Sequence, residues 1–279
     1  AGIWHNCALK LDGTVECWGG NAFGQTNVPA DLNQIIAIAA GDYFNCVLDT
    51  DGAVQCWGQN DSNQLDVPAD LGPVSAISAG LAYACAINAQ SQVRCWGLDM
   101  YGQTTVPDDL ENVIGLSAGW AHACALGVNQ TVQCWGLGGS GQTNAPTNAN
   151  YVSVSAGMFH SCAMDLSNEI TCWGNNSTEQ LEIPQKLNTA MAVAAGGFSS
   201  CAIDSRREVQ CWGSNAEGQN NVPNGYSKAV QVSAGLNHTC ALTPLGEAYC
   251  WGNNGHSQMS ILDTFENAIA IEAGNAITC

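Results

Sequence analysis

The sequence predicts an all-β fold, a seven-bladed β-propeller of about 39-residue repeats with one disulfide-stapled hairpin in each blade. Three observations lead to this prediction. An Ala-Gly motif followed by a cysteine recurs along the whole chain, and a Cys-Trp-Gly motif follows it at a constant distance. The residues between these motifs form short alternating runs separated by turn residues, without a recurrent helical period.

Two series of residues define the repeat. Glycine precedes cysteine by five positions at Gly2/Cys7, Gly41/Cys46, Gly80/Cys85, Gly119/Cys124, Gly157/Cys162, Gly196/Cys201, Gly235/Cys240 and Gly274/Cys279. Cys-Trp-Gly begins ten residues after each of the first seven cysteines, at Cys17, Cys56, Cys95, Cys134, Cys172, Cys211 and Cys250. Repeats therefore start near residues 1, 40, 79, 118, 156, 195 and 234. We expect residues 1–274 to form one propeller and residues 275–279 to begin an eighth motif.

Each repeat divides into strands and turns. In "CALKLDGTVECWG", two alternating runs flank Asp12-Gly13, which is a hairpin turn signal. "NAFGQTNVP" supplies Asn, Gly and Pro for a loop, and "IIAIAAG" supplies an apolar strand that leads into the next repeat. A strand-only unit of this length cannot cover both faces of its own sheet. We therefore expect neighbouring units to pack radially into a closed ring.

The C-terminal end of the sequence predicts how the ring closes. The first repeat lacks the apolar strand that precedes Ala-Gly elsewhere, whereas "AIAIEAG" at residues 268–274 has this strand with no complete repeat after it. We predict that Ala268 to Glu272 completes the first blade. Residues 275–279 would then project from the ring. Cys279 has no partner in the repeat pattern, so we expect an unpaired or intermolecular cysteine, or a natural protein that continues.

The recurrent cysteines allow three interpretations: a disulfide, a metal site or a reactive thiol. A short turn at Asp12-Gly13 places Cys7 opposite Cys17 on antiparallel strands, at a separation that a disulfide tolerates. His5 shares a strand face with Cys7, which makes zinc ligation an alternative. Phe44 stands at the position of His5 in the second repeat, and a phenyl ring cannot ligate zinc although both cysteines remain. We therefore favour the disulfide.

Seven disulfides follow from this interpretation. The predicted pairs are Cys7–Cys17, Cys46–Cys56, Cys85–Cys95, Cys124–Cys134, Cys162–Cys172, Cys201–Cys211 and Cys240–Cys250. Cross-linking a loop of about 11 residues removes roughly 2–3 kcal/mol of chain entropy from the unfolded state. Such cysteine usage persists in oxidising surroundings, so we expect a secreted, extracellular or cell-surface protein with no metal and no cofactor.

The repeat resembles a known family. Its pattern "AGxxHxCALxxDGxVxCWGxNxxGQxxVP", seen in "AHACALGVNQTVQCWG" and "CWGGNAFGQTNVP", is similar to the regulator of chromosome condensation repeat, whose members form seven-bladed propellers. The "GQTTVP" loop and the repeat length resemble secreted bacterial members, including propeller-type inhibitors of β-lactamases. The resemblance implies that the histidines at this repeat position, such as His122, are structural.

The resemblance also implies a binding face. In the β-lactamase-inhibiting relatives, this face combines aromatic residues just after Ala-Gly with residues of the Trp-Gly-x-Asn loops. The matching candidates here are Trp4, Phe23, Tyr43, Phe44, Asp61, Tyr83, Asp99, Tyr101, Trp120, Phe159 and Phe198. Exposed aromatic residues are typical of protein-binding hot spots. The same residues could instead fill the space between blades, and the sequence leaves both interpretations open.

Composition narrows the range of partners. Six basic and 24 acidic side chains give a formal charge of −18, which disfavours nucleic acid and anionic membrane surfaces. No apolar run is long enough to span a bilayer, so we expect no membrane insertion. The expected partner is a protein or a second copy of the chain, with a glycan as a further possibility. Glycosylation acceptor sequences occur at Asn60, Asn129, Asn175, Asn176 and Asn237.

Two functions compete at this point. The first is a non-catalytic, extracellular, disulfide-stabilised scaffold for protein interaction. The second is a structural subunit or fragment of an extracellular filament, appendage or long surface repeat protein. An enzyme is disfavoured because the sequence shows neither a Ser, His and Asp order typical of a catalytic triad nor a phosphate-binding loop.

Overall fold

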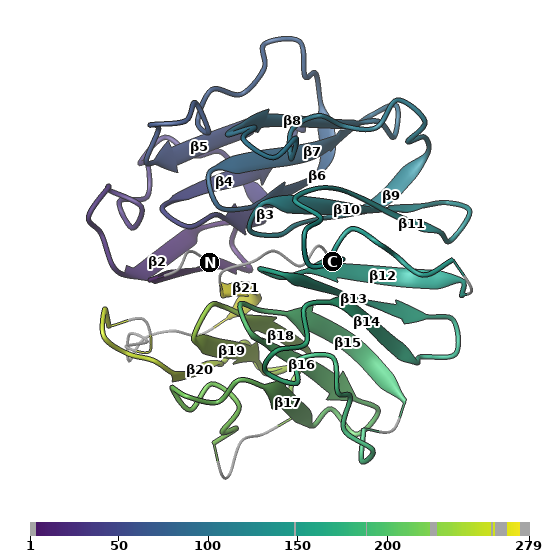
Figure 1. Ribbon diagram of the computed structural model, residues 1–279. Helices are drawn as coiled ribbons and strands as arrows, with labels where there is room; N and C mark the ends of the chain where they lie inside the picture. Colours follow the sequence, from purple (N-terminus) through teal and green to yellow (C-terminus); the bar gives the residue numbers. More distant parts are fainter. Residues whose placement is uncertain are drawn as a thin grey trace.

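The seven predicted blades form a ring of three-stranded sheets. The computed structural model describes residues 4–147, 149–187, 189–223, 228–257, 259 and 267–273. Within them, 21 strands form seven antiparallel sheets of three strands each, which confirms the all-β propeller. Figure 1 shows the sheets following one another around the ring in the order of the sequence colours.

Each sheet has an inner, a middle and an outer strand. The inner strands, which contact one another around the ring, are β3 (Ile35–Ala40), β6 (Val74–Ala79), β9 (Val113–Ala118), β12 (Tyr151–Ala156), β15 (Ala190–Ala195), β18 (Gln231–Ala234) and β21 (Ala268–Ala273). The middle strands are β1 (His5–Lys10), β4 (Phe44–Asp49), β7 (Tyr83–Asn88), β10 (His122–Gly127), β13 (His160–Asp165), β16 (Ser199–Asp204) and β19 (His238–Leu242). The outer strands are β2 (Val15–Gly19), β5 (Val54–Gly58), β8 (Val93–Gly97), β11 (Val132–Gly136), β14 (Ile170–Gly174), β17 (Val209–Gly213) and β20 (Ala248–Gly252).

The apolar core lies between adjacent blades. Leu48 of β4 packs in one cluster with Ile77 of β6 and Trp96 of β8, so side chains of the second blade are covered by the third. Burial of this kind contributes roughly 1.5–3 kcal/mol for each large side chain. No blade can gain it alone, which is why the repeats are stable only as a ring.

The predicted hairpins and disulfides are present. Gly13 has φ of +80°, and the turn that it makes brings Cys7 opposite Cys17. All seven predicted pairs are bonded, with Cα–Cα distances of 4.0 to 4.1 Å. The disulfide interpretation is therefore confirmed, one bond joining the middle and outer strands of each blade. Cys279 and residues 275–279 lie outside the described residues.

Neighbouring blades are joined through a glutamine carbonyl. In six blades the indole Nε1 of the Cys-Trp-Gly tryptophan donates to the main-chain oxygen of a glutamine in the preceding outer loop, at 2.8 to 3.1 Å. The donor and acceptor pairs are Trp57 and Gln25, Trp96 and Gln64, Trp135 and Gln103, Trp173 and Gln142, Trp212 and Gln180, and Trp251 and Gln219. Each outer loop is thereby attached to the next blade.

The histidines take part in the same junction. His122 Nε2 lies 2.8 Å from Ser161 Oγ in the next blade, and Ser161 Oγ donates to the Gln142 carbonyl at 3.1 Å. Because the serine proton is already used, the histidine proton sits on Nε2. His160, Ser200 and the Gln180 carbonyl repeat this chain one blade further on. These histidines are structural, as the family resemblance implies.

Two blades replace this polar chain by an apolar pair. Phe44 and Tyr83 occupy the histidine position, and the residues that follow them one blade on are Ala84 and Ala123. The Tyr83 hydroxyl donates to the His122 carbonyl at 2.6 Å. The seven junctions therefore show three arrangements: a histidine faces a polar side chain at four, a large ring faces alanine at two, and Ser199 stands at the histidine position with Thr239 one blade on at the last.

The predicted closing strand is also present. β21 pairs with β1 in antiparallel register, with Ala8 opposite Ile271 and Cys7 opposite Glu272. Gln231 of the seventh blade reaches across to this strand, since its Nε2 donates to the Ile271 carbonyl and its Oε1 accepts from the Ile271 amide, both at 3.0 Å. Small residues such as Ala192 hold the position of Gln231 in other blades, so this side chain is specific to the closure.

Replacing Gln231 by leucine should weaken the ring. Gln231→Leu leaves an amide and a carbonyl of the fully buried Ile271 without these partners, and we expect a loss of about 1–3 kcal/mol in the free energy of unfolding. Urea unfolding followed by fluorescence measures it. Met191→Ala, at an exposed neighbouring position, is the control and should change the value by less than about 0.5 kcal/mol. Equal effects of the two substitutions would contradict this account of closure.

The buried histidines should make the fold sensitive to acid. Burial lowers the pKa of His122 to about 3 and that of His160 to about 4. In the unfolded chain these groups bind protons below pH of about 6.5, whereas in the folded chain they stay neutral, so the stability they contribute above pH 6.5 is lost as pH falls towards 3 to 4.

A double substitution tests this by copying the apolar junction. His122→Phe with Ser161→Ala removes one such group, so its free energy of unfolding should fall by about 1.4 kcal/mol less per pH unit between pH 5.5 and 4 than that of the wild type. Urea unfolding at a series of pH values measures both slopes. Parallel curves for the two proteins would contradict the assignment.

Candidate binding face

The two ends of the ring differ in what they carry. We call the loop face the end formed by the connections from inner to middle strands, such as residues 41–43, and by the loops after the outer strands, such as residues 59–66. Phe44 pairs with Gly58, and the Gln59 amide donates to the Tyr43 carbonyl at 2.9 Å, so these two kinds of connection lie side by side. The turn face is the opposite end, which holds the hairpin turns and the entries to the inner strands.

Main-chain hydrogen bonds link the connections of neighbouring blades on the loop face. The Asp42 amide donates to the Leu81 carbonyl, the Leu81 amide to the Trp120 carbonyl and the Trp120 amide to the Gly157 carbonyl, at 3.1 to 3.3 Å. A Cβ on Gly119 would lie 2.3 Å from the Gly157 carbonyl oxygen, so only glycine permits this approach. The side chains of this position are therefore held close together from blade to blade.

One aromatic cluster lies over the junction of the first and second blades. The ring centroids of Trp4 and Tyr43 are 5.5 Å apart, and those of Phe23 and Tyr43 are 5.1 Å apart. His256 stacks on Trp4 with a centroid distance of 4.3 Å. Phe23 is 45% exposed, and Trp4 and Tyr43 are half-buried, so the cluster presents ring surface to solvent. His256 was not expected from the sequence.

A second aromatic cluster extends over the fourth to sixth blades. Trp120 and Phe159 have ring centroids 5.5 Å apart, and Phe159 and Phe198 are 5.9 Å apart. All three side chains are half-buried. Met158 and Leu236, which the sequence analysis did not single out as site residues, stand at the same repeat position as Trp120 and are also partly exposed.

Two of the expected face residues are wrong. Phe44 and Tyr83 are fully buried, because they occupy the histidine position of the blade junction, where the Tyr83 hydroxyl contacts the Gly119 and His122 carbonyls of the next blade. Their alignment in the repeat with His5 and His122, which are structural histidines, could have predicted this burial. The aromatic residue that reaches the face stands one position earlier, as Tyr43 does.

Acidic side chains also lie on the loop face. Asp61 and Asp99 are exposed on the outer loops, as is Tyr101. Burial opposes ionisation of Asp99, but hydrogen bonds from Thr104 and Thr105 outweigh it and hold the pKa of this carboxyl below its ordinary range. Asp42, which the sequence analysis did not select as a site residue, is only 5% exposed at the centre of the face, and burial raises its pKa well above the ordinary value.

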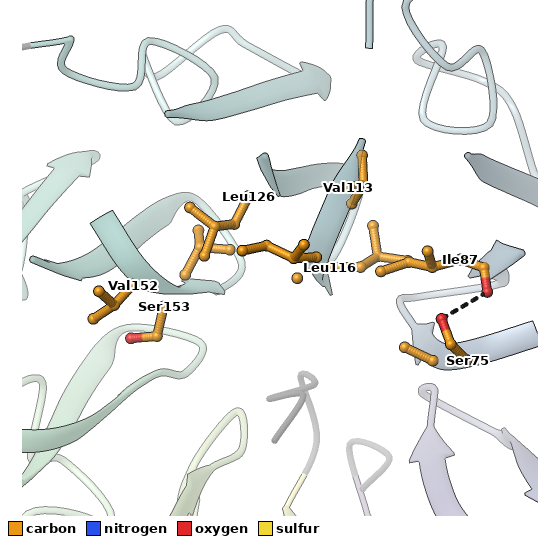
Figure 2. Close-up of a pocket in the computed structure, with 11 residues that line it drawn as sticks. Ser75, Ile87, Val113, Leu116, Leu126, Val152 and Ser153 are labelled. Atoms are coloured by element: carbon orange, nitrogen blue, oxygen red, sulfur yellow. Dashed lines mark hydrogen bonds between the residues drawn. The ribbon is translucent and has the colours of Figure 1, made fainter. Parts of the chain in front are cut away.

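The turn face holds a recess with different properties. It has a volume of about 290 Å³ and lies between the inner strands β6, β9 and β12, where Gly115 leaves room that Ala, Ser or Gln fills in other blades. Figure 2 shows Leu116 between Ile87 and Leu126, and the Ser75 hydroxyl donating to the Ile87 carbonyl at 3.3 Å. No titratable side chain lines the recess, so it offers apolar packing space without an acid or base.

Among the described residues, no three His, Cys, Asp or Glu side chains are grouped as metal ligands would be. None of the described segments forms a helix that is long and apolar enough to cross a membrane.

The repeat assigns the chain to a family. A model of the regulator of chromosome condensation repeat matches residues 1–25, 35–64, 113–142, 151–180, 192–219 and 229–258, which is more than half of the chain. The chain belongs to this family. Among curated protein sequences, none matches significantly.

Several solved structures are similar to this chain over most of its length. The ectodomain of the Arabidopsis thaliana receptor kinase ACR4 is 28% identical, with a TM-score of 0.76, and the match covers 94% of each chain. The ectodomain of the Physcomitrella patens receptor kinase CR4 is 26% identical, with a TM-score of 0.77, over 90% of this chain and 71% of that one. Prp20p from Saccharomyces cerevisiae, described with its binding to Gsp1p and histones, is 18% identical over 99% of this chain and 86% of that one, with a TM-score of 0.77.

Proposed function

We propose that this chain is a non-catalytic, extracellular protein-interaction module that binds its partner through the loop face. The observation that carries the proposal is the pair of partly exposed aromatic clusters, Trp4–Tyr43–Phe23 and Trp120–Phe159–Phe198. Ala82 and Ala121 stand at the position of Tyr43 in two other blades, so the scaffold does not require a ring there.

The setting of these rings suits recognition. The outer loop that carries Phe23 is attached to the next blade through the Gln25 carbonyl, and Gln25 Oε1 also accepts from the Phe23 amide at 2.9 Å. The connection that carries Phe159 is joined to the neighbouring outer loop, because the Asn175 amide donates to the Phe159 carbonyl at 2.8 Å. A side chain held in this way loses little conformational entropy when a partner binds, which raises affinity. Aromatic anchors on a rigid surface are the usual centre of a protein interface.

Two further observations support an extracellular location and a protein partner. Seven disulfides persist in an oxidising compartment. Two of the similar structures are ectodomains of plant receptor kinases. The aromatic residues just after Ala-Gly also stand where the resemblance to β-lactamase-inhibiting members implies a binding face, which is compatible with the proposal.

A photo-crosslinking experiment tests the face. A benzoylphenylalanine at Phe23 or Phe159 should crosslink one discrete protein from the extracellular fraction of the source organism, whereas the same probe at the exposed turn-face residue Leu166 should not. No discrete product, or the same product from all three positions, would contradict the proposal.

Once the partner is purified, the contribution of an aromatic side chain to the binding affinity can be measured. Phe159→Ala should weaken its binding about 30-fold or more, because truncating an aromatic anchor typically costs at least about 2 kcal/mol. Leu166→Ala is the matched control and should leave the dissociation constant unchanged. Thermal unfolding of both variants checks that the ring is intact, and isothermal titration measures the affinity.

A further inference from the structure

The charged side chains divide unevenly between the two ends of the ring. The chain has six basic side chains, and all lie on the turn-face side: Lys10, Arg94, Lys186, Arg206, Arg207 and Lys228. Lys10 ends β1 beside its hairpin turn, and Arg206 and Arg207 belong to another hairpin turn. The Arg207 carbonyl accepts from the Ala229 amide next to Lys228. Arg94 lies near the turn end of β8 and pairs with Asp70 at 3.1 Å. The loop face therefore carries no lysine or arginine.

The loop face carries exposed carboxylates instead. They are Asp61, Asp66, Asp99, Glu179, Glu182 and Glu217. Neutral groups are the donors in the hydrogen bonds that these side chains accept: Asn60 Nδ2 donates to Asp66 at 3.0 Å, and Asn176 Nδ2 donates to Glu182 at 2.8 Å. The negative charges of this face are therefore not compensated by the basic side chains of the chain.

The repeats themselves show that the loops do not need these charges. Asp99 Oδ1 accepts from the Thr104 amide, and the same bond is made in sibling loops by neutral Asn21 and Asn60. Asp66 accepts from an asparagine amide in the way that Asn27 does in the first loop, where Asn21 donates at 2.8 Å. The scaffold is satisfied by an amide, so the carboxylates add charge alone.

The loop face also holds a buried carboxyl oxygen without a hydrogen-bond partner. Asp42 is 5% exposed, and its Oδ2 has no hydrogen-bond partner. Leu81, Trp120 and Met158 stand at the same position in other blades, so an acid here is an exception to an otherwise apolar pattern. A buried carboxyl without a partner is costly unless a cation or donor reaches it.

We propose, resting on the loop face as the binding surface, that the partner is a basic protein surface that places arginine side chains on these aromatic clusters. A guanidinium group stacks on an aromatic face and bonds to a carboxylate at its edge, and Arg does both better than Lys. The face offers that combination: Thr178, which precedes Glu179, donates its hydroxyl to the Phe198 carbonyl at 3.0 Å, so this acidic loop lies against the second cluster.

A second copy of the chain fits this face less well. The turn face carries the six basic side chains, but exposed carboxylates outnumber them there; among these are Asp31, Asp51, Asp70, Asp108, Asp109, Glu111 and Glu169. Stacking copies end to end would therefore bring two net negative surfaces together, which costs free energy at physiological salt. A basic partner gains from the same charges.

Matched charge variants test the proposal. The loop-face triple Asp66→Asn, Asp99→Asn, Glu182→Gln and the turn-face triple Asp31→Asn, Asp51→Asn, Asp108→Asn change the net charge equally. The probe is a synthetic peptide with four arginines, compared with the same peptide in which citrulline replaces arginine. We expect isothermal titration at 150 mM salt to show binding of the arginine peptide only. The loop-face triple should weaken it at least tenfold and the turn-face triple less than twofold.

The remaining outcomes separate this inference from the proposed function. Equal weakening by both triples, equal binding of the citrulline peptide, or concentration-dependent self-association through the loop face in sedimentation would overturn the basic-partner proposal. Phe159→Ala should weaken the arginine peptide more than a lysine peptide, and an equal effect would also count against it. A crosslinked loop-face partner whose contact surface is not basic would overturn this inference and leave the proposed function standing.

Discussion

The glutamine carbonyl of each outer loop is the contact on which the rest of the ring depends. At six junctions it accepts a hydrogen bond from the tryptophan indole of the next blade. At several junctions it also accepts from the residue that follows the histidine position; Asn45 Nδ2, for example, donates to the Gln25 carbonyl at 2.7 Å. Such a buried oxygen must be paired, because leaving it empty costs about 1–3 kcal/mol. The disulfide holds each hairpin together, but this carbonyl holds one blade to the next.

The junction tolerates change in its neighbours as long as the carbonyl keeps one donor. Gln64 and Gln103 receive the tryptophan donor, and Ala84 and Ala123 supply no second one. At these two junctions Phe44 and Tyr83 fill the volume that histidine and its partner occupy elsewhere. The histidine position is therefore not constrained in residue type, and Ser199 also occupies it. The tryptophan that supplies the carbonyl with its donor is present in every complete repeat.

The sequence was most informative where all repeats agree. Seven cysteine pairs in phase with a turn signal predicted the disulfides and blade number, and the unmatched apolar run at 268–274 predicted the closing strand. The sequence analysis placed Phe44 and Tyr83 on the binding face, but both are buried. Successive side chains of a strand face opposite ways, and the sequence alone does not show at which residue the middle strand begins. The sequence analysis did not select Asp42 as a site residue. Comparison of the repeats identifies the scaffold residues that they share, whereas an acid that occurs in one repeat has no counterpart to compare with.

That same contrast gives the loop face its functional interpretation. In some outer loops an Asn makes a hydrogen bond that an Asp makes in the equivalent loop of another blade. The fold is satisfied by either residue, so the negative charge of the Asp serves an interaction outside the fold. Asp66 and Asp99 meet this condition on the exposed loops of the loop face. Asp49 accepts from the Asp51 and Ala53 amides as Asn88 does from the equivalent amides of the next blade, but Asp49 is buried in a turn and presents no charge to a partner. Because the loops are anchored at the glutamine carbonyls, such exchanges alter the surface without disturbing the ring. A scaffold built in this way lets one face change its partner while each blade keeps its neighbours.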